Sequence, residues 1–137
     1  MDIREDKAWL LRSRFNPFPI SGALALSEGQ ISFTLDEDAG ESALDWLEAR
    51  LEAGDLKSRI EAGESVVAFA YPLAGCEVTW PITGGGAMMI VQTPGRRWVV
   101  SYDYPAGAGG AISNTMSLIS GRRKAKEWKR ALAESEA

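Results

Sequence analysis

The chain has 137 residues, the length of one ordinary domain, with 45% hydrophobic and 25% charged residues. These are the proportions of a globular protein rather than of a disordered one. It contains no histidine, which excludes Ser-His-Asp and Cys-His catalytic systems and removes the commonest zinc ligand. A single cysteine, Cys76, excludes an internal disulfide and fits a cytoplasmic location. We therefore expect one domain over residues 1–137, with no enzyme activity, cofactor or metal.

Targeting signals are not expected. The first six residues are charged and lead into no apolar run, unlike a secretory signal. Two uncharged runs, 78–95 and 104–121, are interrupted by glycine and polar residues. Neither run offers the roughly 20 consecutive apolar residues that a membrane-spanning helix needs.

Three strands are predicted in the first part of the chain. The first covers residues 7–15 and ends before a pair of prolines. Residues 21–27 and 30–35 follow, joined by Glu28 and Gly29. A two-residue connection that contains glycine, followed by an arm that alternates apolar and polar residues, predicts a β-hairpin.

An acidic helical insertion is predicted over residues 36–64, with ten acidic residues against three basic ones and a net charge of −7. Ser42 and Asp45 have the spacing of a capping box, and leucines then recur at helical intervals. The pattern predicts one helix over 42–53 and a shorter one over 55–62.

The remainder is predicted to be extended until a closing helix. Further strands are expected at residues 66–71, 77–80, 87–92 and 97–104. A helix over 120–133 carries one apolar stripe, formed by Gly121, Ala125, Trp128 and Leu132. The predicted fold class is therefore α+β. It is a curved antiparallel sheet or partly open barrel of about seven strands, with the insertion after the third strand and a C-terminal capping helix.

These elements resemble a known family. The segment 22–33, Gly-Ala-Leu-Ala-Leu-Ser-Glu-Gly-Gln-Ile-Ser-Phe, is similar to a hairpin of bacterial pleckstrin-homology-like and GRAM-type domains. The strand, polar turn and strand over 87–102 look like a later unit of that family. The helix with Trp128, followed by Lys-Arg-Ala-Leu, resembles its capping helix.

The resemblance covers residues 20–35 and 66–132. The insertion at 36–64 departs from the family pattern and leaves the strand order around it open. The resemblance implies a small binding or scaffold domain, because the family shares no catalytic residues.

The chemical candidates have simpler structural interpretations. The acidic run 36–41 has Glu41 and Leu47 where a calcium-binding EF-hand loop needs glycine and glutamate, whereas acids before a helix suit its N-terminal dipole. The glycine-rich stretches 84–86 and 106–111 match no phosphate-binding motif and are interpreted as loops. Cys76 has no histidine to serve as a base.

An interaction surface is predicted from four residues: Trp46, Arg122, Lys126 and Lys129. Trp46 lies about 100° off the leucine stripe of its helix, which predicts an exposed indole. The three cations share one face of the last helix, within a segment, 120–137, of net charge +3. That face is compatible with an anionic lipid, with solvent, or with the acidic segment of the same or a second chain.

Together these observations predict a non-catalytic interaction or scaffold module that binds a protein partner or pairs with itself as a homodimer. The alternative is a lipid-headgroup or small-ligand binder that uses the barrel mouth near the glycine-rich loops. The net charge of −4 makes nucleic-acid binding unexpected and anionic membrane contact weak.

Overall fold

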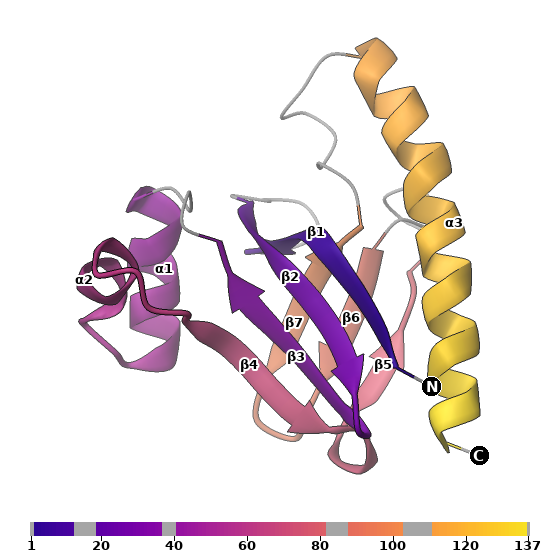
Figure 1. Ribbon diagram of the computed structural model, residues 1–137, viewed down its shortest axis with the longest axis horizontal. Helices are drawn as coiled ribbons and strands as arrows, with labels where there is room; N and C mark the ends of the chain where they lie inside the picture. Colours follow the sequence, from indigo (N-terminus) through magenta and orange to yellow (C-terminus); the bar gives the residue numbers. More distant parts are fainter. Residues whose placement is uncertain (1, 13–18, 37–40, 82–87, 103–110, 137) are drawn as a thin grey trace.

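Strand order in the computed structural model is β4-β3-β2-β1-β7-β6-β5, and every neighbouring pair is antiparallel (Figure 1). The structure describes residues 2–12, 19–36, 41–81, 88–102 and 111–136, without the side chains of 41–43, 111–120, 122 and 135–136. The strands are β1 (Ile3–Leu11), β2 (Ile20–Ser27), β3 (Gln30–Leu35), β4 (Val67–Pro72), β5 (Glu77–Thr79), β6 (Met88–Gln92) and β7 (Arg97–Ser101). The helices are α1 (Glu41–Leu51), α2 (Leu56–Glu61) and α3 (Ala111–Glu136), with a 3-10 turn η1 (Leu73–Gly75) between β4 and β5.

The predicted hairpin is confirmed. β2 and β3 pair from Gly22 with Leu35 to Ser27 with Gln30. Glu28 and Gly29 have φ angles of 53° and 74°, the left-handed conformation that a tight two-residue hairpin turn requires. The alternation of the second arm then places Ile31, Phe33 and Leu35 in the core.

The sheet curls so that β4, at one edge, faces β7 across the interior. Trp98 on β7 packs on Phe69 of β4 with ring centroids 5.2 Å apart, although three strands separate β4 from β7 in the sheet. The indole Nε1 of Trp98 also donates a hydrogen bond of 2.9 Å to the hydroxyl of Tyr71. The fold is therefore the predicted α+β class with a curved, partly open barrel of seven strands.

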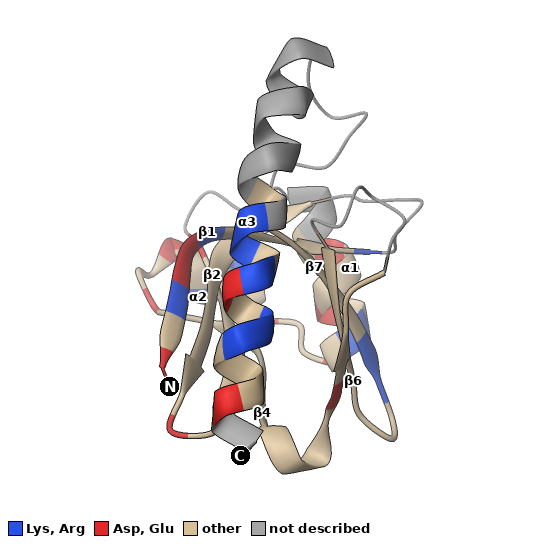
Figure 2. Ribbon diagram, turned by 90° about the vertical axis from the view of Figure 1, so that its right-hand side faces the viewer, with Lys and Arg blue, Asp and Glu red and all other residues tan. Residues whose placement is uncertain are grey.

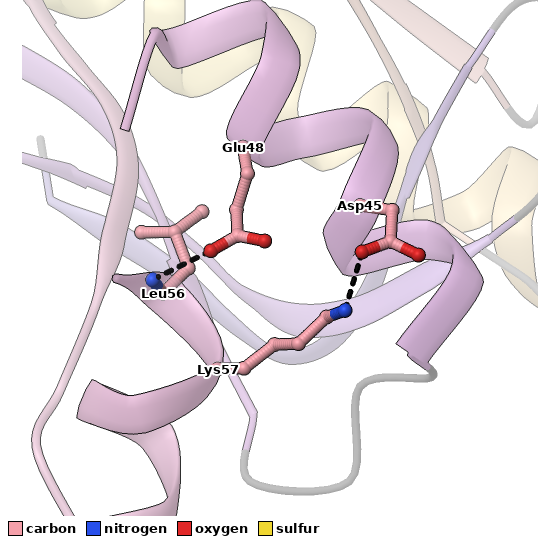
Figure 3. A network of polar contacts seen from close by, with 4 residues as sticks. All are labelled: Asp45, Glu48, Leu56 and Lys57. Carbon is pink, nitrogen blue, oxygen red and sulfur yellow. Dashed lines mark hydrogen bonds and ion pairs between the residues drawn. The ribbon is translucent and has the colours of Figure 1, made fainter. Parts of the chain in front are cut away.

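The insertion after β3 packs α1 on this interior. Leu44 and Leu47 of α1 and Leu56 of α2 are buried in the main core. The two helices are joined by polar contacts, because the carboxylate of Glu48 accepts the backbone N–H of Leu56 at 3.0 Å and Lys57 forms an ion pair with Asp45 (Figure 3).

Helix α3 covers the barrel on the opposite side from α1 and α2. Figure 1 shows α1 and α2 at the left and α3 at the right, and in Figure 2, which views that right side, α3 lies in front of the sheet. The predicted stripe is confirmed, since the buried positions of α3, among the side chains that the structure describes, are Gly121, Ala125, Trp128, Ala131 and Leu132.

Several predicted boundaries were wrong. β1 begins at Ile3 instead of Lys7 and ends at Leu11, so Arg12 lies beyond it. Residues 13–15 of the predicted strand lie outside the described residues. α3 begins at Ala111 instead of about Ser120. α1 already includes Ser42, so this residue is not an N-cap, and Asp45 pairs with Lys57 instead of closing a capping box.

Candidate functional site

The outer side of α3 carries four exposed basic side chains, here called the basic face: Arg123, Lys126, Lys129 and Arg130. Lys126 lies three residues from Arg123 and from Lys129 and four from Arg130, so it has three like-charged neighbours on the helix surface. Glu127 is the acidic residue within this stretch and reduces the repulsion only in part. Such spacing disfavours an isolated helix slightly and is suited to a negatively charged partner.

The basic face is held in place by the buried side of the same helix turns. Trp128 has no exposed surface, packs on Tyr102 with ring centroids 6.1 Å apart, and donates its Nε1–H to Glu5 at 3.4 Å. The same Glu5 carboxylate forms an ion pair of 3.5 Å with Lys124. β1 therefore fixes both the position and the rotation of α3, which leaves the cations of the basic face exposed.

Lys129 also contacts an aromatic ring, unlike the other described cations of the basic face. Its ammonium nitrogen lies 5.5 Å from the centroid of the Trp80 ring, within the range of a cation–π interaction. The indole of Trp80 is held by its N–H bond of 3.2 Å to the Tyr102 hydroxyl, which in turn lies 3.1 Å from the sulfur of Met89. Burial raises the pKa of Tyr102, so this hydroxyl stays protonated.

Trp46, which was predicted to be an exposed part of the interaction surface, is half-buried. It packs against the main core, and the guanidinium carbon of Arg50 lies 5.7 Å from the centroid of its ring. Its position one residue beside the leucine stripe placed the indole at the boundary of the buried face, where it contributes to the attachment of α1 to the barrel.

The insertion carries five exposed carboxylates, which form what we call the acidic surface: Asp45, Glu52, Asp55, Glu61 and Glu64. Asp45 pairs with Lys57, and Glu64 lies 3.8 Å from Arg59. Glu52, Asp55 and Glu61 form no ion pair with any residue that the structure describes. Among the described side chains of the insertion, the exposed charges without an ion pair are therefore negative.

The structure does not bring the four predicted site residues together. Trp46 lies on α1, whereas Lys126 and Lys129 lie on α3 at the far side of the sheet (Figures 1 and 2). The side chain of Arg122 lies outside the described residues. The glycine-rich stretches 84–86 and 106–110 and residues 37–40 of the acidic run lie outside them as well, so the predicted ligand mouth has no described geometry.

Chemically reactive arrangements are sparse in the described part of the chain. No group of three or more acidic or cysteine side chains there is placed to hold a metal ion. Burial raises the pKa of the Cys76 thiol, which donates to the backbone oxygen of Pro72 at 3.3 Å, so the nucleophilic thiolate is disfavoured.

An open hollow of about 590 Å³ lies on the outer side of β1, β2 and β3. It is lined by Arg4, Lys7, Ala23, Thr34, Leu35, Asp36 and Ser65. Both cations of the hollow already pair with carboxylates, Arg4 with Asp6 at 2.6 Å and Lys7 with Asp36 at 2.9 Å. They are therefore less available to an anionic ligand than the basic face.

Comparison with models of protein families, with curated proteins and with solved structures found no match. Among the described helices, none is both long enough and apolar enough to cross a membrane. The basic face of α3 and the acidic surface of the insertion are thus the features of this chain on which a functional proposal rests.

Proposed function

We propose that this protein is a non-catalytic interaction module that acts in the cytoplasm and binds an acidic protein partner through the basic face of α3. The observation that carries the proposal is that the same turns of α3 have one side buried in the core and another side that is exposed and basic. Trp128 and Leu132 fix one side in the core, while Lys126 and Arg130 on the other side are exposed and form no ion pair with a described residue. A rigid helix that presents unpaired cations suits electrostatic recognition of a protein surface.

A protein partner fits these charges better than a membrane does. Stable attachment to an anionic bilayer takes several cations together with an apolar anchor. The described outer side of α3 carries Glu127 and Glu134 among its cations and presents no exposed large apolar side chain. The relationship to pleckstrin-homology-like domains remains a proposal that the sequence resemblance alone supports.

The test is a direct binding measurement with two matched probes, a fluorescent glutamate-rich peptide and vesicles of phosphatidylcholine with phosphatidylserine. We expect the peptide to bind at low salt and the vesicles to bind weakly. The double variant Lys126→Glu with Arg130→Glu should lose peptide binding. A control, Arg4→Glu with Arg97→Glu, has the same net charge, changes exposed residues outside the basic face, and should keep binding.

If vesicle binding persisted at physiological salt and were lost in the Lys126→Glu and Arg130→Glu variant, the partner of the basic face would be a membrane and not a protein. Absence of binding to either probe would remove the basic face as the functional site.

A further inference from the structure

The partner of the basic face can be specified further, on the premise that this face does bind acidic proteins. The molecule carries both halves of a complementary pair. Three cations, Arg123, Lys126 and Arg130, and three carboxylates, Glu52, Asp55 and Glu61, are exposed and form no ion pair with a described residue.

The two sets cannot neutralise each other within one chain. α1 and α2 lie on one side of the curved sheet and α3 on the other, with the strands between them, as both ribbon views show (Figures 1 and 2). The anchoring of α3 through Trp128 and of α1 through Leu47, both with no exposed surface, keeps the two surfaces apart. A contact between them therefore needs two copies of the chain.

We infer that the acidic surface of a second copy of this chain occupies the basic face of α3, so that molecules associate head to tail. Because the two surfaces differ and lie on opposite sides, each contact leaves one basic face and one acidic surface unused. A heterologous contact of this kind extends to longer assemblies unless its rotation closes a ring. The geometry therefore favours open association over the two-fold homodimer that the sequence suggested.

Exposed ion pairs are weak and are screened by salt. The association is therefore expected at low ionic strength and high protein concentration. The screening length is about 30 Å in 0.01 M salt and about 3 Å in 1 M salt, so these two conditions separate an electrostatic contact from an apolar one. Trp46 is half-buried against the core of its own molecule, so we expect it to contribute less to the association than the charged side chains do.

The test uses sedimentation velocity on two charge-reversed full-length proteins. In the base-reversed protein, Lys126→Glu and Arg130→Glu change the summed charge at the three unpaired cation positions from +3 to −1. In the acid-reversed protein, Glu52→Lys and Glu61→Lys change the summed charge at the three unpaired carboxylate positions from −3 to +1. All four positions are exposed, and retained tryptophan fluorescence will confirm that both proteins fold.

We expect the wild-type weight-average mass to rise with concentration in 0.01 M salt without a plateau at the dimer, and to return to the monomer in 1 M salt. Each reversed protein alone should stay monomeric, because its two sets of unpaired side chains then have the same sign. Their equimolar mixture should associate again, since each surface of one protein meets an opposite surface of the other. The Arg4→Glu and Arg97→Glu control should associate like the wild type.

A monomeric wild type in 0.01 M salt, or a mixture that stays monomeric, would overturn head-to-tail association. If the glutamate-rich peptide still bound the basic face in that case, the proposed function would stand with a different partner. If the peptide also failed to bind, both proposals would fall. A wild-type mass that stops at the dimer would overturn the open geometry.

Discussion

The guanidinium carbon of Arg50 lies 4.5 Å from the centroid of the Trp98 ring, over an indole that is itself 1% exposed. Its Nη2 donates to the backbone oxygen of Arg97, while its Nε is buried without a hydrogen-bond partner. Burial, and then the positive charge of Arg96, lower the pKa of Arg50, although a guanidinium remains charged under all ordinary conditions. One cation therefore attaches the acidic insertion to the barrel.

The first prediction concerns this attachment. Arg50→Ala should lower the free energy of unfolding by about 2 kcal/mol, because it removes a partly desolvated cation–π contact and one hydrogen bond. Arg50→Met should cost less, about 1 kcal/mol, since its unbranched chain still packs on the two indoles and removes the unpaired Nε. Urea unfolding measures both changes, and the exposed Arg97→Met is the matched control, expected within about 0.5 kcal/mol of wild type. Equal losses for Met and Ala would show that packing of the side chain contributes nothing.

The second prediction concerns the close approach of β2 and β3. A Cβ atom on Gly22 would lie 2.3 Å from the backbone oxygen of Thr34 and 2.6 Å from the Phe33 ring, so Gly22→Ala must displace one of them. Overpacking of this kind costs about 1–3 kcal/mol. Gly54→Ala is the control, because nothing lies within 4 Å of its Cβ position. Thermal unfolding should give a lower midpoint for the first variant alone, and a Gly22→Ala protein as stable as wild type would contradict so close an approach of the two strands.

The secondary structure was largely predictable from local patterns, whereas side-chain contacts between distant segments were not. The β2–β3 hairpin follows from the turn at Glu28 and Gly29, and it forms as predicted. The start of β1 was missed because its first residues are charged. The side chain of Glu5 is only 13% exposed and is stabilised by Trp128 and Lys124 from α3. No local sequence pattern reveals these contacts with a distant helix.

The same distinction holds for the candidate surfaces. The basic face follows from helical spacing, and the burial of Trp128 was predicted from its stripe. The role of Arg50 was missed, because its two indole neighbours come from α1 and β7 and are brought together only when the sheet curls. The start of α3 was missed because residues 111–119 contain serine, threonine and asparagine, which favour helices weakly.

The third prediction concerns alkaline pH and Tyr102. The pKa of this hydroxyl is raised in the folded protein, whereas in the unfolded chain it titrates near 10. Above pH 10 the unfolded state loses this proton while the folded state keeps it, so the unfolded state is favoured and stability falls as pH rises. Below pH 10 the residue adds no pH dependence. Urea unfolding between pH 8 and about 11.5 should therefore show a shallower decline for Tyr102→Phe than for wild type. The matched control, Phe33→Leu, changes a buried aromatic residue of the same core that has no titratable group and should decline like wild type; an equal slope for all three proteins would contradict the prediction.

The last prediction concerns the docking of α3. Trp128 has no exposed surface and packs on Tyr102, so Trp128→Ala should lower the free energy of unfolding by about 3–5 kcal/mol, as large aromatic truncations in a core do. Lys126→Ala, two residues away on the exposed side of the same helix, should change it by less than about 0.5 kcal/mol. Urea unfolding followed by circular dichroism measures both. The Trp128 variant should also lose binding of the glutamate-rich peptide as α3 detaches, because the basic face then has no fixed orientation. A loss of less than about 1 kcal/mol would show that α3 is not held by this side chain, and peptide binding that survived the loss of α3 docking would show that a rigid helix is not required for recognition.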